Sequence, residues 1–186
     1  MTALREALFS GVEPELEAVL AAREARVARR QAALSRSGLP AVSISPVMPG
    51  PVKDCPASRH LQEAALDALD KLFQERRWLA SRVWAVTGPT GPNALIVVDA
   101  PAVELKRALI ELEATHPLGR LWDLDVTDPR SGGLSRRGLG LPVRRCLICD
   151  EPAHVCSRSR AHSLDALLGA IEERIHAFRP DLCAAR

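Results

Sequence analysis

The feature that most constrains this fold is the order of the elements predicted in the central part of the chain. Runs rich in β-branched residues alternate with segments whose apolar residues recur every three or four positions, and prolines and glycines separate them. The sequence predicts, in order, a strand at 41–48, a helix from 56 to about 78, strands at 82–87 and 94–99, a helix from 101, and a strand at 119–126. Strand, helix, strand, strand, helix, strand is the split βαβ or ferredoxin-like order, so we expect an α+β fold with an antiparallel sheet.

Helical segments flank this core on both sides. An arginine-rich helix is predicted from Pro14 to about Ser37, and a last helix with an apolar face is predicted at 164–178. We therefore expect a single domain, 1–186, in three parts. They are a helical N-terminal arm at 1–38, an α+β core at 41–127, and an Arg/Cys-rich loop with a C-terminal helix at 131–186.

The composition indicates a soluble globular protein. Hydrophobic residues make up 47% of the chain and charged residues 26%, close to the average for that class. No apolar run is long enough to span a bilayer, and the first residues carry acids where a secretory signal would be apolar. We therefore expect a cytoplasmic protein with no membrane partner. The five cysteines are an odd number, which argues against a disulfide framework and favours reduced thiols or metal ligands.

Arginines gather in two stretches, at 23–36 and at 136–160, although the net charge of the chain is only +2. The total charge is too small to indicate a nucleic-acid binder, so the distribution of the arginines matters more. Both stretches suit an anionic partner. The alternative is that each is simply a solvated, charged surface.

Two aspartates stand within the last predicted strand. Asp123 and Asp125 are two positions apart, so on an extended backbone both side chains point to one face. The opposite face takes the apolar residues Trp122, Leu124 and Val126. Carboxylates spaced in this way can bind Mg²⁺, whose other ligands are then water and substrate phosphates. The alternative is that both acids are solvated on an open sheet face.

The predicted topology brings other polar residues toward this pair. The first and last strands of a split βαβ unit are antiparallel neighbours, so the turn after the first strand should lie beside the start of the last. Lys53 and Asp54 are in that turn, and Arg120 precedes the last strand. For Asp54 the alternative is a role at the start of the following helix. His116 is a candidate catalytic base, although a histidine that ends a helix often only interacts with the helix dipole.

A second constellation lies in the stretch CLICDEPAHVCSRSRAH. Cys146, Cys149, Cys156 and His162 give thiolate and imidazole ligands of the kind that structural zinc favours in a tetrahedral site. His154 is a rival for the fourth position. The spacing is that of a compact knuckle and matches no common zinc finger. The alternatives are reduced buried thiols or a redox pair, and Cys55 and Cys183 are expected to be isolated residues.

Four stretches of the chain occur together in a fixed order. They are LAAREARVARRQ at 20–31, MPGPVKD at 48–54, ELEATHPLGRLWDLDV at 111–126 and LSRRGLGLPVRRCLICDEPAHVCSRSRAH at 134–162. Together they resemble the citrate lyase holo-acyl-carrier-protein synthase family, the phosphoribosyl-dephospho-CoA transferases, over nearly the whole chain. The cysteine-rich stretch belongs to that family pattern.

The resemblance implies a nucleotidyltransferase. It would move 2'-(5''-triphosphoribosyl)-3'-dephospho-CoA onto a serine of the apo acyl carrier (gamma) subunit of citrate lyase and release pyrophosphate. The nucleophile then belongs to the acceptor, which agrees with the lack of an obvious nucleophilic serine motif here. By analogy with a transferase of malonate decarboxylase that depends on a DxD pair, Asp123 and Asp125 would hold Mg²⁺.

The resemblance also suggests roles for the basic residues. The residues expected to bind the substrate are Lys53, Asp54, Arg120, Arg136 and Arg137. Arginine suits this task because its planar fork matches two phosphate oxygens. The carrier is expected to be acidic, so the arginine stretch at 23–36 is a possible docking surface for it.

A rival interpretation is a non-catalytic module in which a zinc knuckle and an open sheet grip RNA or a protein. Sheets that bind RNA usually expose aromatic residues for stacking on bases. Aromatic residues are only 3% of this chain, and the open face carries acids. We therefore expect no nucleic-acid partner.

Overall fold

The computed structural model describes residues 3–178, so Cys183 and the end of the predicted C-terminal part lie outside the described residues. The elements are α1 (Ala3–Phe9), α2 (Leu16–Ser37), β1 (Ala41–Pro46), α3 (Pro56–Arg76), β2 (Leu79–Val86), β3 (Asn93–Asp99), α4 (Ala102–Thr115), η1 (Gly119–Leu121), β4 (Trp122–Asp128), β5 (Gly132–Gly133), η2 (Arg137–Leu139), α5 (Ala153–Ser159) and α6 (Leu164–Phe178). The predicted order of four strands and two helices in the core is confirmed. None of the helices in this range is both long and apolar enough to cross a membrane.

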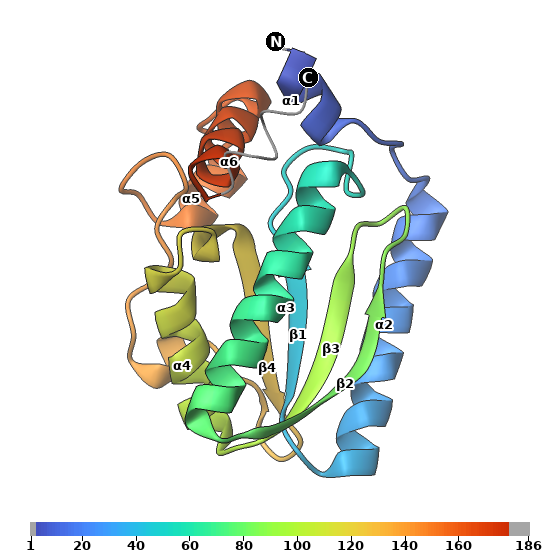
Figure 1. The fold of residues 1–186 in the computed structure, drawn as a ribbon, viewed down its shortest axis with the longest axis vertical. Helices are drawn as coiled ribbons and strands as arrows, with labels where there is room; N and C mark the ends of the chain where they lie inside the picture. The colour runs from blue at the N-terminus through green and yellow to red at the C-terminus, as the bar shows by residue number, and fades with distance from the viewer. Residues whose placement is uncertain (1–2, 179–186) are drawn as a thin grey trace.

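The strands form one sheet in the order β2-β3-β1-β4-β5, and all neighbouring strands are antiparallel. The fold is therefore α+β, as predicted (Figure 1). The predicted pairing of the first and last core strands is also confirmed. In its register Ser43 stands opposite Asp125, and Ser45 stands opposite Asp123.

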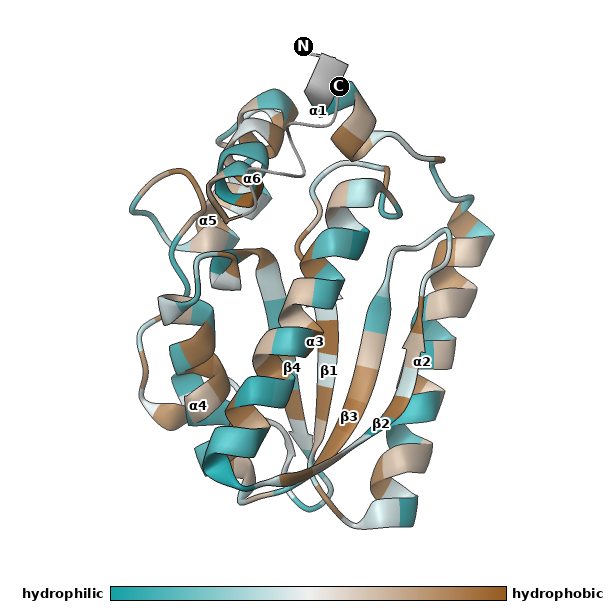
Figure 2. Cartoon of the chain, in the orientation of Figure 1, coloured by the Kyte–Doolittle hydropathy of each residue, from teal (hydrophilic) through white to brown (hydrophobic). Residues whose placement is uncertain are grey.

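The two faces of the sheet are covered differently. On one face, alternate residues of β1, β3 and β4 pack against α3 and α4 to form the main core, which includes Ile44, Ile96 and Trp122. On the other face, Leu95 and Val97 pack against Ala33 of α2 in a smaller cluster. Figure 2 shows the apolar residues concentrated along β1 and β3, while hydrophilic residues occupy much of α3. The second face thus stays open along β4, because α2 contacts β1 and β3.

Local sequence explains where the long helices begin and end. Gly38 ends α2 in the left-handed conformation (φ 65°), and its amide donates to the carbonyl of Leu34. Pro56 occupies the first turn of α3, and the backbone amide of Cys55 donates a hydrogen bond to the Ser58 hydroxyl at 3.0 Å. Cys55 is buried, so it is a structural residue at the start of this helix.

The connection between α4 and β4 depends on a glycine. A Cβ atom on Gly119 would lie 2.6 Å from the carbonyl oxygen of Glu113 and 2.7 Å from that of Leu112. Only glycine therefore allows the chain to turn back against the end of α4. This close turn places β4 directly beside α4.

The N-terminal and C-terminal helices meet at one end of the sheet (Figure 1). Arg5 of α1 forms ion pairs with Asp165 and Glu172 of α6, at 2.6 and 2.7 Å. Ile171 and Ile175 of α6 are fully buried and belong to the main core. The segments predicted as an N-terminal arm and a C-terminal part are thus in contact, through residues that the sequence alone did not connect.

Candidate active site

The two aspartates of β4 lie on the open face of the sheet, as the alternation of the strand predicted. The side chain of Asp123 is 53% exposed and that of Asp125 is 64% exposed. Within residues 3–178 each forms one ion pair: a guanidinium nitrogen of Arg144 lies 3.7 Å from Asp123, and the ammonium of Lys106 lies 3.6 Å from Asp125. Partial burial, followed by the charge of Asp125, raises the pKa of Asp123 above its usual value of 3.8. The carboxylate oxygens of Asp123 and Asp125 are therefore accessible to solvent, and the positive charges of Arg144 and Lys106 lie next to them.

Side chains satisfy the backbone groups of β4 that do not pair with β5, and they hold the strand in place. The buried ammonium of Lys106 donates to the carbonyl of Leu124 at 2.8 Å, and Glu113 accepts from the amide of the same residue at 3.3 Å. Arg144 donates to the carbonyl of Trp122 at 2.5 Å. Buried backbone groups that face no neighbouring strand need such partners. The carboxylate pair therefore stands on a strand whose position α4 and the following loop fix.

Arg136 takes part in this support from the loop. Its guanidinium donates to Glu113 at 2.5 Å, and the Glu113 side chain is almost fully buried. This pairing neutralises a carboxylate that would otherwise be costly to bury. Arg137, also predicted to bind the substrate, is exposed in η2.

Arg120 links β4 to the cysteine-rich loop. Its guanidinium donates to the backbone carbonyls of Arg145 and Cys146, and Arg144 in turn donates to the carbonyl of Arg120 at 2.9 Å. Partial burial, together with the charge of Arg144, lowers the pKa of Arg120. The predicted substrate ligand Arg120 thus holds two loops together.

Lys53 and Asp54 are engaged elsewhere. The ammonium of Lys53 donates to the carbonyl of Met48 at 2.6 Å, and partial burial lowers its pKa. Asp54 accepts two hydrogen bonds of 2.8 Å from Arg59 of α3, which is the alternative role at the start of the helix. Within residues 3–178, no hydrogen bond or ion pair joins either side chain to Asp123. The pairing of the strands was predicted correctly, but the turn does not bring these residues into contact with the carboxylates.

His116 lies on the helix-covered side of the sheet. Its ring packs against Trp122, with centroids 4.4 Å apart, and against Phe178 at 5.2 Å. Its Nδ1 accepts from the amide of Leu118 at 3.1 Å, and partial burial lowers the pKa of the ring. Trp122 points away from the face that carries the aspartates, so His116 is not placed to act as a base beside them. Its contacts are those of a residue that ends α4 and packs the turn.

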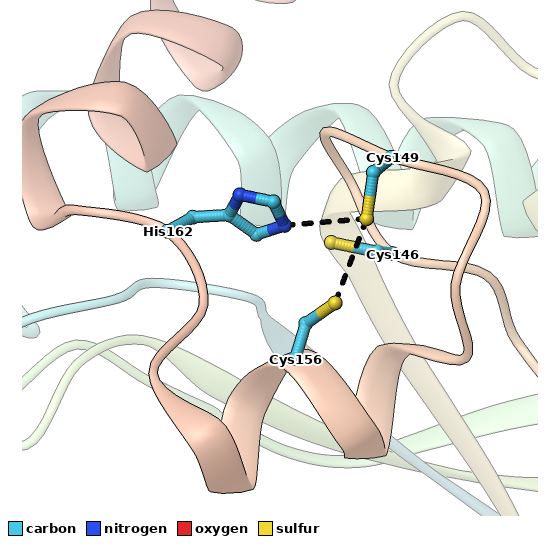
Figure 3. A group of neighbouring side chains, drawn as sticks. All are labelled: Cys146, Cys149, Cys156 and His162. Atoms are coloured by element: carbon cyan, nitrogen blue, oxygen red, sulfur yellow. Dashed lines mark hydrogen bonds between the residues drawn. The ribbon is translucent and has the colours of Figure 1, made fainter.

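The cysteine-rich stretch folds into a compact cluster of four potential metal ligands (Figure 3). The Sγ atoms of Cys146, Cys149 and Cys156 and a ring nitrogen of His162 all lie within 4.8 Å of one another. Cys149 is 3.5 Å from Cys156 and 3.3 Å from Nε2 of His162. His154 is exposed on α5 and is not part of the cluster. The four side chains can therefore bind a metal ion.

Backbone hydrogen bonds shape the loop that carries the first two cysteines. The amide of Cys146 donates to the carbonyl of Glu151 at 2.7 Å, which closes a knuckle. The amide of Ile148 donates to the sulfur of Cys146 at 3.5 Å. Cys156 enters from α5, and His162 from the connection to α6. The loop thus brings together ligands that are up to sixteen positions apart.

Three residues around the carboxylates were not identified from the sequence as site residues. They are Lys106, Glu113 and Arg144. The first two belong to α4 and are almost fully buried although charged. Charged residues on the buried face of a helix are rare unless they have partners. The positions of Lys106 and Glu113 on the apolar side of the helical pattern could therefore have indicated that they bind groups at the site.

Comparison with known proteins assigns the chain to a family. Residues 14–178 match the family model described as apo-citrate lyase phosphoribosyl-dephospho-CoA transferase. Relatives with that same name from Escherichia coli O9:H4 (strain HS) and from Escherichia coli O1:K1 / APEC are each 43% identical over 159 residues, which is 86% of this chain and 85% of theirs. Both the described core and the cysteine cluster lie inside the matched range. The chain therefore belongs to the apo-citrate lyase phosphoribosyl-dephospho-CoA transferase family, and it is a transferase.

Proposed function

We propose that this chain attaches 2'-(5''-triphosphoribosyl)-3'-dephospho-CoA to a serine of the apo acyl carrier (gamma) subunit of citrate lyase and releases pyrophosphate. The name shared by its relatives supports this substrate pair. The observation that carries the proposal is the pair Asp123 and Asp125, held side by side on the open face of β4, a strand that side chains of α4 and of the following loop hold in place. A transferase of phosphate esters needs this kind of accessible anionic site next to cationic groups.

The carboxylate pair fits Mg²⁺. Both side chains offer oxygen atoms, both are more than half exposed, and neither is the acceptor of a short hydrogen bond within residues 3–178. Oxygen ligands with room for water and phosphate are what Mg²⁺ requires. When bound, the ion would neutralise charge on the leaving pyrophosphate.

The protein's own residues would orient the reactants. Lys106 and Arg144 limit the movement of the two carboxylates by ion pairs of 3.6 and 3.7 Å. In the transfer, the serine oxygen of the carrier forms a bond to the α-phosphorus, and the bond from that phosphorus to the bridging oxygen of the β-phosphate breaks. The serine proton passes to solvent and the electron pair leaves with pyrophosphate. Catalysis is then mainly positioning and electrostatic stabilisation.

The metal that best suits the second cluster is zinc. Three thiols and one imidazole match a structural Cys₃His site, in which Zn–S bonds of about 2.3 Å and Zn–N bonds of about 2.0 Å surround one centre. The site would stabilise the loop between β5 and α6, which Arg120 and Arg144 tie to β4. Elemental analysis of protein purified under reducing, chelator-free conditions tests this assignment, and a preparation without zinc would contradict it.

The element order and antiparallel pairing support assignment of the core to the ferredoxin-like class. The contact of α1 with α6 supports treating the three parts of the chain as one transferase domain. We also propose that the enzyme works in the cytoplasm, where reduced cysteines would persist.

The direct test of the function is mass spectrometry of the acceptor. The purified chain is incubated with Mg²⁺, the triphosphoribosyl precursor and apo carrier subunit. The carrier should gain the mass of the phosphoribosyl-dephospho-CoA group, and pyrophosphate should appear in equal amount. A carrier of unchanged mass, with precursor and folded enzyme present, would refute the proposed reaction.

The alternative of a binding module without catalysis is not favoured. Family membership supports an enzyme. The open face of β4 exposes two carboxylates, which repel the phosphates of RNA unless a cation lies between them.

A further inference from the structure

A cavity lies between α2 and the open face of the sheet. Its volume is about 300 Å³, and it is lined on the helix side by Arg23, Arg26, Arg29 and Arg30. Residues of β1 and β3 form its floor, among them Ser43 and Ser45. The C-terminal half of α2 packs tightly through Ala33 and Leu34. The arginines precede this anchor and line the cavity; Arg26 and Arg30 are half-buried, and Arg23 and Arg29 are exposed.

Within the part of the chain that the structure describes, no ion pair balances the positive charge of Arg23, Arg26 and Arg30 in this cavity. No acidic residue is among the described residues that line it. None of the ion pairs within residues 3–178 involves Arg23, Arg26 or Arg30. Burial, and then the charge of Arg23, lowers the pKa of Arg26. Like charges gathered on one face of a helix are unfavourable, and a bound anion would relieve them.

One of the four arginines is already oriented. The guanidinium of Arg29 lies 4.0 Å from the ring centroid of Trp84 on β2. A cation on an aromatic face in this way has less freedom than an arginine in solvent. The contact with Trp84 restricts the conformations of the Arg29 side chain. Trp84 itself lines the cavity.

The cavity lies beside the strand that carries the carboxylate pair. Ser43 and Ser45 line the cavity, and the same two residues stand opposite Asp125 and Asp123 on the neighbouring strand. Directly opposed residues have Cβ atoms about 4.5–5.5 Å apart on the same face. One row of serines therefore separates the arginines from the proposed magnesium ligands. A triphosphate is long enough to reach from the arginines of α2 across this row of serines to Asp123 and Asp125.

We propose that this cavity, which we call the arginine groove, binds the triphosphate of the donor substrate. This inference rests on the proposed function, which requires a polyphosphate beside Asp123 and Asp125. It changes the role expected from the sequence for the stretch at 23–36, from an outer docking surface for the carrier to an inner phosphate site. The side chains of Lys53 and Asp54 are then not needed for that task.

The test measures binding of inorganic tripolyphosphate to the full chain by calorimetry in magnesium-free buffer. Arg26→Gln and Arg30→Gln should each raise the Kd by about tenfold, the loss expected for one charge-assisted hydrogen bond. Arg36→Gln is the matched control, because Arg36 is exposed on the same helix and does not line the groove. It should change the Kd less than about twofold. The charge reversal Arg26→Glu should remove measurable binding, provided that circular dichroism shows an intact fold.

Two controls separate this claim from others. Dephospho-CoA carries a diphosphate but no triphosphate, so its binding should be unaffected by Arg26→Gln. In transfer assays Arg26→Gln should raise the KM for the donor and leave the KM for the carrier unchanged. Equal tripolyphosphate binding by Arg26→Gln and wild type, or a raised KM for the carrier alone, would overturn the proposal. If the wild type does not modify the carrier but its tripolyphosphate binding still depends on Arg26 and Arg30, the transfer reaction fails and the arginine groove stands.

Discussion

Ser45 of β1 and Asp123 of β4 are directly opposed in the sheet, and their side chains lie on the same face. Ser45 also lines the cavity beneath the arginines of α2. The pair therefore marks the boundary between a basic cavity and an acidic strand. A divalent cation and a phosphate chain would meet at such a boundary, because each neutralises the charge of one side.

Replacing Asp123 should make the folded protein more stable, although the proposed magnesium site needs its carboxylate. Asp123→Asn removes a charge whose pKa is raised by partial burial and by Asp125, so the folded protein should become more stable at pH 7. The gain should be at most about 1 kcal/mol, because water screens a half-exposed side chain. Urea unfolding of wild type and Asp123→Asn measures it. A loss of more than about 1 kcal/mol would show that the carboxylate is a structural residue.

The pH dependence follows from the same carboxylate. An acid whose pKa is raised on folding destabilises the folded state once it ionises, so that stability falls as pH rises from 3.8 through the raised pKa. Binding of Mg²⁺ should favour the anion and lower that pKa. Carbon-13 NMR titration of the Asp123 carboxyl group should give a value above 3.8 without magnesium and a lower one with it. An identical titration in both conditions would contradict the metal site.

Lys106 should be important for the position of β4. Lys106→Met removes the donor to the carbonyl of Leu124 and the ion pair to Asp125, and it leaves the carbonyl without its partner. The free energy of unfolding should fall by about 1–3 kcal/mol, the cost of a buried polar group without a hydrogen bond. Lys71→Met, at an exposed position of α3, is the control and should have little effect. Equal stability of the two variants would contradict the bracing role.

Metal removal should act locally on the C-terminal part. A chelator, or His162→Ala, should increase hydrogen exchange of the amides of Cys146 and Ala153, which close the knuckle. His154→Ala is the matched control, because His154 is exposed and outside the ligand cluster. Exchange mass spectrometry with and without chelator measures the effect. Unchanged exchange in zinc-loaded, chelated and variant protein would mean that the cluster is held by packing alone.

Much of the fold was predictable because its signals are local. The alternation around Asp123 placed the carboxylates on one face, and the element order gave the pairing of β1 with β4. The sequence also indicated the possible metal ligands Cys146, Cys149 and Cys156, and in the structure His162, not His154, lies beside them. The short helix α1 and its contact with α6 were not predicted, since the ion pairs of Arg5 join residues about 160 positions apart.

Where the side chains of the predicted site residues Lys53 and His116 lie depends on packing between elements. Lys53 stood at the right end of β1, but its side chain turns back to the carbonyl of Met48. His116 is close to Asp123 in sequence, yet the turn at Gly119 leaves it on the opposite side of the sheet, against Trp122. No periodicity specifies which face of a sheet a long helix will cover. For that reason, the position of the α2 arginines could be seen only in three dimensions.

The most direct measurement is the initial rate of carrier modification, followed by intact mass, for Asp123→Asn and Asp125→Asn beside the control Asp99→Asn. Asp99 is an exposed aspartate at the end of β3, away from β4. Removal of one metal ligand should lower the rate at least about a hundredfold, while the control keeps the rate of wild type. If the Asp123→Asn/Asp125→Asn double variant modified the carrier as fast as wild type, the chemistry would take place elsewhere in the molecule.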